Sequence, residues 1–336
     1  MKFQPCPRHR RTNRLLSVGG AALLVIGLAA CSSNGGDTAT PSPTADPAET
    51  QRMTVALVTH QAPGDTFWDV VRRGAEAAAE RADVELRYSH DADPVRQADL
   101  VRSAVADKVA GIAVTLANPA VMESAVRAAT AAEIPVVAVN SGIADWKTLG
   151  ALGYFGQDET IAGQAAGERL THEGAKNTLC VIQQPGHVGL EARCAGVATA
   201  FRGQTQKLYV DGIDKRTVKP AIIAKLQQDR SIDRILTLGA PVALIALEAA
   251  GEANSYARVA TFDTNSAVVT AIKNGTVEWA IDQQPFLQGY MAVEALWLYR
   301  TNKNVLGGGQ ASLTGPSFVD ETNIDSVAEL AEAGTR

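Results

Sequence analysis

Residues 53–82 read MTVALVTHQAPGDTFWDVVRRGAEAAAERA, and this stretch decides the fold. Its first part, Met53 to Val58, is a continuous apolar run, which is typical of a strand buried on both faces of a parallel sheet. A polar turn from His60 to Thr66 follows, and from Phe67 to Ala82 apolar residues recur at helical spacing. The pattern therefore predicts a buried strand, a turn and a helix that lies against the same sheet.

This unit repeats along the chain in two series. The first series has apolar runs at 84–88, 111–116 and 135–139, with helices expected after Asp93-Pro94 and Asn118-Pro119. The second series follows Gly150 and alternates helices and strands at 160–172, 178–183, 190–203, 207–210, 218–228, 235–238, 241–251 and 258–262. Two successive βα series of similar size predict an α/β fold with two doubly wound parallel-sheet lobes.

Length and composition agree with such a fold. The chain has 336 residues, of which 46% are hydrophobic and 20% are charged, and this suits two lobes with large cores. The formal net charge of -5 argues against a nucleic-acid partner, because proteins that bind nucleic acids normally carry clusters of Lys and Arg. We therefore expect no nucleic acid among the partners of this protein.

The N-terminus has the features of an export signal. A basic start is followed by an uncharged apolar run at residues 15–30, which is too short for a comfortable membrane span. The run ends in Leu28-Ala29-Ala30-Cys31, which resembles the bacterial lipobox, where the cysteine is lipidated and becomes the mature N-terminus. We interpret residues 1–30 as a lipoprotein signal peptide and Cys31 as the lipidation site. The alternative is an ordinary signal peptide, or a short anchor helix in which the cysteine is incidental.

The segment after Cys31 fits this interpretation. Residues 32–49 are rich in Ser, Thr, Pro, Gly and Ala, a composition that buries too little surface to offset the entropy of ordering. We therefore expect a flexible tether over residues 31–52. Arg10-Arg11 is also compatible with a twin-arginine export signal, although the surrounding pattern is poor. Either route places the protein outside the cytoplasm, where the lipid on Cys31 would anchor it to the cell membrane.

The cysteines suit an oxidising compartment. Cys6 leaves with the signal peptide and Cys31 takes the lipid, so Cys180 and Cys194 remain. These two either form one disulfide or stay as two buried free thiols, and the sequence favours neither. No His or Cys stands beside either one at the spacing of metal ligands, so we expect no metal site.

Polar and aromatic residues follow the predicted strands. In doubly wound sheets ligands bind beyond the carboxyl ends of the strands. The candidate ligand contacts at these ends are Asp65, Phe67, Trp68, Asn118, Asn140, Arg193, Asp263 and Gln283. Carboxylates, amides, a guanidinium and aromatic rings together suit a hydroxylated ligand. For Asp65 and Asn118, helix capping alone is the alternative. His60 and His187 at loop ends either titrate near neutral pH or simply form hydrogen bonds.

Several of these residues belong to an ordered series of motifs. The series is Asp65-Thr66-Phe67-Trp68 with Gly74-Ala75, then residues 134–140 (IPVVAVN), Asp158 with Gly163, Arg193 with Gly196, Thr261-Phe262-Asp263, Asn274-Gly275, and Asp282-Gln283-Gln284-Pro285 with Gly289. From about residue 53 to 325 the chain resembles the ribose-binding type of periplasmic sugar-binding protein. A single one of these motifs would be weak support, whereas the ordered series is specific.

The resemblance implies two lobes joined by three hinge crossings, near residues 157–158, 283–284 and 310–314. The first lobe would comprise residues 53–157 and 284–311, the second 158–283 and 312–325, and residues 326–336 would form a C-terminal tail. The rings of Phe67 and Trp68 would flank a sugar ring, and Asp65 and Asn140 would bind its hydroxyls from the first lobe. The remaining contacts, from the second lobe and the hinge, would be Arg193, Asp263 and Gln283.

The resemblance also implies a transport role. The protein would be a monomer without a cofactor, and it would deliver a small sugar or polyol to the permease subunits of an ABC importer. Three departures from the ribose binders argue against ribose itself: Ser141 replaces an Arg, Gly239-Ala240-Pro241 replaces Asn-Asp, and the aromatic expected near Ile213 is absent. We therefore expect another sugar or polyol, or a furanose-like signalling molecule.

Other classes of protein fit the sequence less well. The cytoplasmic LacI-type repressors share this core but need a DNA-binding helix-turn-helix in front of it, where this chain has a lipoprotein signal. A sugar-processing enzyme would need a nucleophile, phosphate or metal motif, and G-x-S-x-G, G-x-x-x-x-G-K-[ST] and H-E-x-x-H are all absent. We therefore expect that the protein is not an enzyme. A sensing module that presents a bound ligand to a membrane receptor remains an alternative, because it would use the same closed form.

Overall fold

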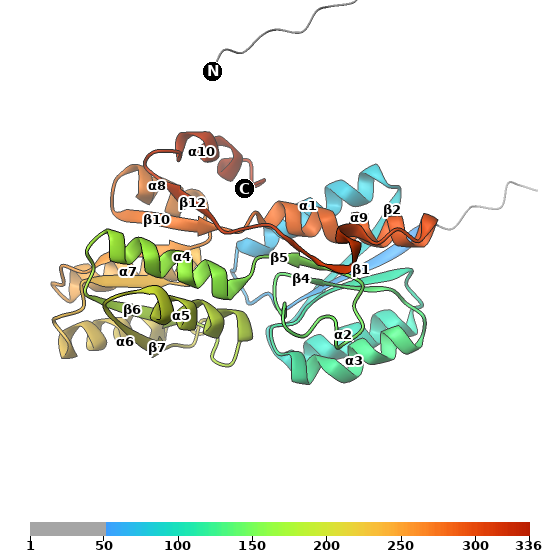
Figure 1. Ribbon diagram of the computed structural model, residues 1–336, viewed down its shortest axis with the longest axis horizontal. Helices are drawn as coiled ribbons and strands as arrows, with labels where there is room; N and C mark the ends of the chain where they lie inside the picture. The colour runs from blue at the N-terminus through green and yellow to red at the C-terminus, as the bar shows by residue number, and fades with distance from the viewer. Residues whose placement is uncertain (1–51) are drawn as a thin grey trace, which may run out of the picture. The chain divides into compact units, whose positions relative to one another are not determined.

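Figure 1 shows the computed structural model, which describes residues 52–336. In this part of the chain the strands form two separate six-stranded sheets, and helices alternate with the strands. The predicted α/β fold with two doubly wound lobes is confirmed. The expected signal peptide at 1–30, the expected lipidation site Cys31 and all but the last residue of the expected tether at 31–52 lie outside the described residues.

The first sheet is entirely parallel, with the strand order β11-β5-β4-β3-β1-β2. Its strands are β1 (Met53–Thr59), β2 (Val84–His90), β3 (Gly111–Thr115), β4 (Val136–Val139), β5 (Tyr154–Gly156) and β11 (Ala311–Leu313). One face is covered by α1 (Phe67–Arg81) and α9 (Pro285–Asn302), and the other by α2 (Pro94–Ala106) and α3 (Pro119–Ala131). The winding reverses between β1 and β3, which is where such sheets bind ligands.

The second sheet repeats this plan with the order β12-β10-β9-β8-β6-β7, and only its edge strand β12 is antiparallel. Its strands are β6 (Asn177–Ile182), β7 (Gln204–Tyr209), β8 (Arg234–Thr237), β9 (Arg258–Phe262), β10 (Val277–Asp282) and β12 (Ser317–Asp320). The covering helices are α4 (Glu159–His172) and α5 (Val188–Ala200) on one face, and α6 (Lys215–Gln228), α7 (Ala240–Glu252), α8 (Ser266–Lys273) and α10 (Asp325–Glu332) on the other. None of the helices within residues 52–336 is long and apolar enough to cross a membrane.

The chain passes between the two sheets three times. The connections are residues 157–158 between β5 and α4, residues 283–284 between β10 and α9, and residues 314–316 between β11 and β12. The third connection lies later than the sequence implied, because β11 first pairs with β5 and therefore belongs to the first lobe up to Leu313. The expected tail at 326–336 contains most of α10, whose Val327, Ala328 and Ala331 belong to the core of the second lobe.

Paired glycines let two pairs of helices approach closely. In the first lobe α1 and α9 meet at Gly74 and Gly289, and in the second lobe α4 and α5 meet at Gly163 and Gly196. A Cβ atom on any of the four would overlap backbone atoms of the facing helix, so only glycine fits. The contact in the second lobe matters for the site, because it brings Arg193 on α5 against the start of α4.

A disulfide fixes the same helix to the sheet. Cys180 in β6 and Cys194 in α5 are bonded to each other, and both are fully buried. Of the two alternatives that the sequence left open, the structure therefore has the disulfide. Because Cys194 directly follows Arg193, the bond also holds the turn of α5 that carries this arginine.

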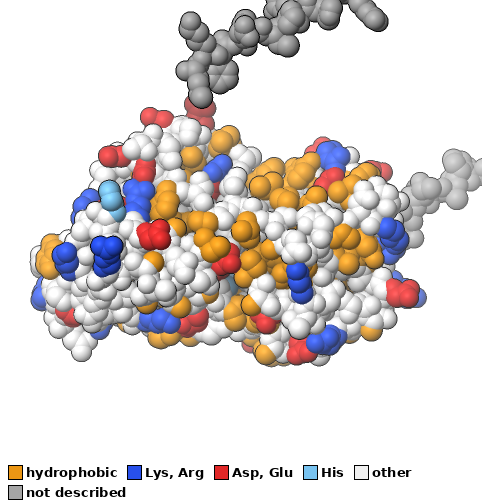
Figure 2. Space-filling view, viewed as in Figure 1, with side chains coloured by type: hydrophobic (Ala, Val, Ile, Leu, Met, Phe, Trp, Pro, Cys, Tyr) orange, Lys and Arg blue, Asp and Glu red, His pale blue; other side chains and the backbone are white. Residues whose placement is uncertain are grey.

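The surface carries charges of both signs. Over the face shown in Figure 2, basic and acidic side chains are interspersed, and apolar side chains gather over α9 and the neighbouring crossings. On this face we see no extended basic region of the kind that nucleic-acid-binding proteins present.

Candidate ligand-binding pocket

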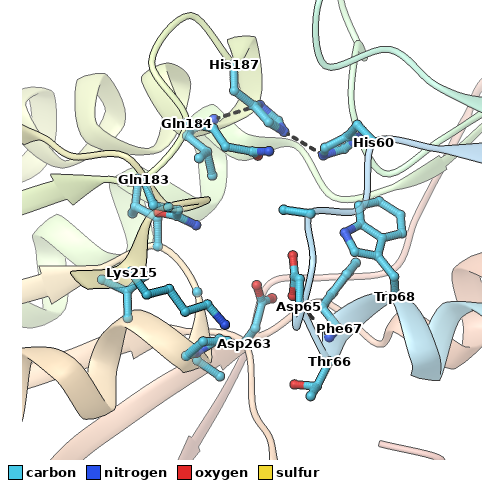
Figure 3. Close-up of a pocket in the computed structure, with 18 of the residues that line it drawn as sticks. His60, Asp65, Thr66, Phe67, Trp68, Gln183, Gln184, His187, Lys215 and Asp263 are labelled. Carbon is cyan, nitrogen blue, oxygen red and sulfur yellow. Dashed lines mark hydrogen bonds between the residues drawn. The ribbon is translucent and has the colours of Figure 1, made fainter. Parts of the chain in front are cut away.

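A pocket lies between the two lobes at the carboxyl ends of the strands, and its empty space, together with the open solvent at its mouth, amounts to about 880 Å³. Figure 3 shows side chains from both lobes converging on it. Most of the residues that the sequence indicated as ligand contacts line this pocket: Asp65, Phe67, Trp68, Asn140, Arg193, Asp263 and Gln283. Residues that are far apart in the sequence thus share one space.

The first lobe contributes a carboxylate beside two aromatic rings. Asp65 Oδ1 accepts a hydrogen bond from the backbone N–H of Phe67 at 3.2 Å, which holds the turn before α1. Asp65 therefore both shapes this turn and lines the pocket, and burial raises the pKa of its carboxyl group. The rings of Phe67 and Trp68 are buried and meet edge to face, with their centroids 5.0 Å apart. This wall suits a ring with hydroxyls at its edge and C–H groups on its faces.

A chain of hydrogen-bonded side chains runs across the hinge from one lobe to the other. Asn140 Nδ2, at the end of β4, donates to Gln283 Oε1 at 2.9 Å. Gln283 Nε2 in turn donates to Asp263 Oδ1, at the end of β9, at 2.7 Å. Gln288 on α9 donates to the same Gln283 Oε1 at 3.0 Å and to Thr314 Oγ1 at 3.1 Å. The three sequence-predicted residues of this chain are therefore coupled, and all are buried.

Asn140 and Asp263 occupy equivalent positions in the two lobes. Each is the first residue after a central strand, and each has a left-handed backbone, with φ of 65° and 64° respectively. This region is unfavourable for most side chains, but Asn and Asp adopt it more readily than other residues with a Cβ. The left-handed turn directs both side chains to the pocket instead of continuing the strand.

Arg193 is largely committed to the protein itself. Its Nε donates to Glu159 Oε2 at 2.5 Å and its Nη2 to Glu159 Oε1 at 2.9 Å, so the pair is bidentate. Its Nη1 donates to the carbonyl oxygen of Leu238 at 3.0 Å and lies 3.9 Å from Asp263 Oδ2. The guanidinium also lies over the ring of Phe262, 4.5 Å from its centroid. These hydrogen bonds use three of the five N–H groups of Arg193, and its charge lies beside Asp263 at the edge of the pocket.

Asp263 is the most strongly perturbed acid of the pocket. Burial raises its pKa to about 7, although Arg193 and the hydrogen bond from Gln283 act in the opposite direction. The carboxylate of Asp65, from the other lobe, raises this pKa further. Two carboxyl groups from opposite lobes thus face the same space, where hydroxyl donors would stabilise their ionised forms.

Two histidines join the lobes directly. His187 Nδ1 caps α5 by accepting the backbone N–H of Gly189 at 3.0 Å, so its proton is on Nε2. This Nε2 lies 3.0 Å from His60 Nε2 and donates to it. His60 Nδ1 then carries a proton and donates to Thr115 Oγ1 at 2.7 Å. The first two of these hydrogen bonds require neutral imidazoles, because His187 Nδ1 and His60 Nε2 accept in them. Burial lowers the pKa of His60 well below its ordinary value and that of His187 to about 3.

The neutral pair predicts a pH dependence of stability. Unfolded histidine takes up a proton below about pH 6.5, whereas folded His187 does not until about pH 3, so its contribution to stability is lost as the pH falls through this window. The variant His187→Asn keeps a residue that caps helices well but has no group that titrates there. As the pH falls from 7 to 5, the difference in unfolding free energy between the wild type and this variant should shrink by about 2 kcal/mol, as measured by urea titration.

Comparing the wild type with His187→Asn removes the contribution of the buried acids to the pH dependence of stability, which has the opposite sign. A raised pKa, as at Asp263, stabilises the folded state as the pH falls from 7 towards 3.8, and this contribution is present in both proteins. Parallel stability curves for the wild type and His187→Asn would show that His187 is solvated and protonated in the folded state.

The second lobe adds residues that the sequence analysis did not select as ligand contacts. Lys215 Nζ at the start of α6 donates to the carbonyl oxygen of Gly64 in the first lobe at 3.1 Å, so it connects the two lobes beside the pocket. Gln183 and Gln184, after β6, also line the pocket. Much of the rest of this wall is apolar and comes from α6, the end of β8 and α7: Val218, Leu238, Ala240, Pro241, Val242 and Ile245. Gln183 and Gln184 follow a predicted strand, which was a usable signal, whereas the apolar wall had none.

Asn118 does not line the pocket. It is the N-cap residue of α3, and its side chain makes no capping hydrogen bond. Leu116 and Ala117 separate it from the end of β3 and carry the chain to the start of the helix. The neighbouring Ala117 instead forms a contact between the lobes, because its carbonyl oxygen accepts the backbone N–H of Val188 at 3.1 Å. Within residues 52–336 no cluster of three or more His, Cys, Asp or Glu side chains could hold a metal ion.

Comparisons with known proteins agree with this architecture. Residues 55–304 match a family model described as a periplasmic binding protein domain. Among curated proteins, the xylose/arabinose-binding protein XylF of Sulfolobus acidocaldarius is 23% identical over 254 residues, which cover 70% of this chain and 63% of that protein. The match thus spans less than two thirds of that relative.

Two solved structures are similar over nearly the whole described region. The carbohydrate transporter of Acidothermus cellulolyticus 11B, in complex with myo-inositol, is 55% identical and has a TM-score of 0.84, and the match covers 85% of this chain and 100% of that one. An ABC sugar transporter (periplasmic sugar binding protein) of Legionella pneumophila is 27% identical with a TM-score of 0.72, and the match covers 79% of this chain and 100% of that one.

Proposed function

The chain belongs to the periplasmic binding protein family, and from its pocket we propose that it captures a cyclitol, myo-inositol foremost, and delivers it to an ABC importer. The observation that carries this proposal is the hydrogen-bonded chain from Asn140 through Gln283 to Asp263, which spans both lobes beside one pocket. The 55% identity to a protein with bound myo-inositol supports the choice of ligand.

The chemistry of the pocket suits a cyclitol. Myo-inositol is a neutral ring in which every carbon bears a hydroxyl that both donates and accepts hydrogen bonds. Asp65 from the first lobe and Asp263 from the second can each accept from hydroxyls, while the rings of Phe67 and Trp68 can contact C–H groups. A ligand with hydroxyls all around its ring contacts both lobes at once, and these shared contacts are what stabilise the closed form.

The neutral groups beside Asn140 favour a ligand other than ribose. Ser141 stands where the ribose-binding type carries an Arg, and its hydroxyl donates to Asn140 Oδ1 at 2.8 Å. Asn140 is thereby fixed from one side by Ser141 and from the other by Gln283. Asn140 thus offers a ligand ring an oriented amide, and the residue that follows it in the chain is neutral Ser141 instead of a cationic Arg.

A binding screen tests the proposal. The purified protein, unfolded and refolded in ligand-free buffer to remove any carried-over ligand, is heated with myo-inositol, other inositols, ribose, xylose, arabinose and glucose. At a ligand concentration of about 100 Kd the folded state gains about 2.7 kcal/mol, which raises Tm by several degrees. We expect the largest shift with an inositol. If no polyol or sugar shifts the Tm of the folded protein, the proposal is wrong.

The location of the protein is part of the same proposal and rests on the sequence. Export by the signal peptide and lipidation of Cys31 would place the pocket outside the cytoplasm, tethered beside a permease in the membrane. Cells grown with labelled palmitate should label the wild-type protein and leave Cys31→Ala unlabelled. Equal labelling of both proteins would show that the anchor is elsewhere.

A further inference from the structure

Gln183 holds a position in the pocket that differs from that of the other amides. It is the first residue after β6, and its carbonyl oxygen accepts the backbone N–H of Gly212 at 2.9 Å. Figure 3 shows its side chain pointing into the pocket from the second lobe. The backbone of Gln183 is therefore fixed, while its amide faces the space that both lobes share.

The amide oxygen of Gln183 is buried and has no hydrogen-bond partner in the part of the chain that the structure describes. By contrast, both ends of the Gln283 amide are used, because its oxygen accepts from Asn140 and its nitrogen donates to Asp263. A buried acceptor without a donor destabilises a protein, so such an atom beside a pocket indicates a donor that comes from a ligand.

The neighbouring strand makes room for this amide. Gly239, directly after β8, is adjacent to Gln183 because β6 and β8 are paired. A Cβ atom on Gly239 would lie 3.0 Å from Gln183 Nε2, and one on Gly212 would lie 3.0 Å from Gln183 Cβ. The φ of Gly239 is -172°, an extended value that any residue adopts, so what this glycine provides is space beside the Gln183 amide and not a special backbone conformation.

We infer that Gln183 is a specificity-determining residue, whose amide accepts a hydrogen bond from one ring hydroxyl and donates to its neighbour. The inference rests on the proposed function. It identifies Gln183 as the residue of the second lobe that recognises a vicinal pair of ligand hydroxyls. After the strand that corresponds to β8, the ribose-binding type carries Asn-Asp, where the present chain has Gly239 and Ala240. The amide that would come from position 239 is supplied here by Gln183 from the adjacent strand.

The test is a cycle in which the residue and the ligand are changed together. Gln183→Met keeps the length of the side chain and removes its hydrogen bonds. Calorimetric titration with myo-inositol should show affinity reduced by about tenfold or more. Against a series of monodeoxy-inositols, the two analogues that each lack one hydroxyl of this vicinal pair should lose affinity for the wild type and bind Gln183→Met as well as myo-inositol does. A purely structural role would weaken all ligands equally and leave their ranking unchanged.

A second variant removes no polar group. Gly239→Ala adds one methyl group against the Gln183 amide and should alter the same deoxy-analogue ranking, because the amide must shift by a few tenths of an ångström. The matched control is Gln164→Met on α4, a half-buried glutamine that does not line the pocket. It should match the wild type in affinity and ranking, and each variant is compared by its Tm to verify folding.

The outcomes separate this inference from the proposed function. If the wild type binds an inositol and Gln183→Met retains both its affinity and its ranking, the inference is wrong and the proposed function stands. If the wild type prefers another polyol, the deoxy analogues of that polyol replace the deoxy-inositols, and an unchanged ranking in Gln183→Met overturns the inference. If the wild type binds no polyol or sugar, both the function and the role of Gln183 are overturned.

Discussion

Replacing Glu159 with alanine is expected to lower the free energy of unfolding by about 3–5 kcal/mol, because it leaves the charge of Arg193 buried without its partner. The two side chains are only 5% and 4% exposed, and the guanidinium makes two parallel hydrogen bonds to the carboxylate. Asp263 is 3.9 Å from Arg193 and replaces this contact only in part. Denaturant unfolding followed by circular dichroism measures the loss.

An exposed ion pair of similar composition provides the control for this variant. Glu123 pairs with Arg127 one turn later on α3, and both side chains are about half exposed. Glu123→Ala should therefore cost only about 0.3–0.5 kcal/mol. The double variant Glu159→Ala/Arg193→Met removes the unpaired charge and should recover part of the stability of Glu159→Ala. A loss below about 1 kcal/mol for Glu159→Ala would mean that water reaches the pair.

Much of the fold could be predicted because the first sheet is parallel, the second is parallel apart from its edge strand β12, and both are covered on two faces. Strands such as β1, β3 and β6 are continuous apolar runs, and this pattern is unambiguous when helices of regular length lie between them. The three-residue strands β5 and β11 were not predicted. They are too short to show a period, and they are defined by their pairing with each other and with β4.

The pocket could be predicted in part for a similar reason. The rule that ligands bind at the carboxyl ends of strands selects Asn140 and Asp263 directly, because each follows a central strand. The same rule misplaced Asn118, since two residues separate it from its strand. Glu159 was missed because an acidic residue in the first turn of a helix is expected from the helix dipole alone. Its pairing with Arg193 depends on how closely α4 and α5 approach, which sequence patterns do not specify.

Replacing Asp263 with asparagine is expected to weaken ligand binding by about 10- to 150-fold, because a hydrogen bond to an ionised group contributes about 1.5–3 kcal/mol. Asparagine is the matched substitution, since the φ of residue 263 is 64° and asparagine adopts this conformation readily. Alanine at this position would add about 1–2 kcal/mol of backbone strain and confuse the result. Calorimetric titration at pH 8, where Asp263 is mostly ionised, measures the effect.

The pH dependence of binding follows from the same carboxyl group. Burial raises the pKa of Asp263 to about 7, so below this pH the folded protein holds a proton that a donating hydroxyl must displace. The sign is therefore a loss of affinity as the pH falls, by about 30-fold between pH 8 and pH 5.5. His187 stays neutral over this range, because its pKa is about 3. In Asp263→Asn the affinity should be independent of pH over the same interval.

Two further variants decide whether Asp263 alone is responsible for the pH dependence of ligand affinity. Asp99→Asn removes an exposed carboxylate on α2, outside the pocket, and should reproduce the wild-type affinity at both pH values. Asp65→Asn removes the facing carboxylate, which raises the pKa of Asp263, so the loss of affinity should shift to lower pH. If Asp263→Asn keeps the wild-type pH profile, the titrating group is Asp65, whose own pKa is also raised by burial. The two carboxyl groups are thus distinguishable, because Asp65 raises the pKa of Asp263 across the pocket and the two substitutions therefore change the pH profile in different ways.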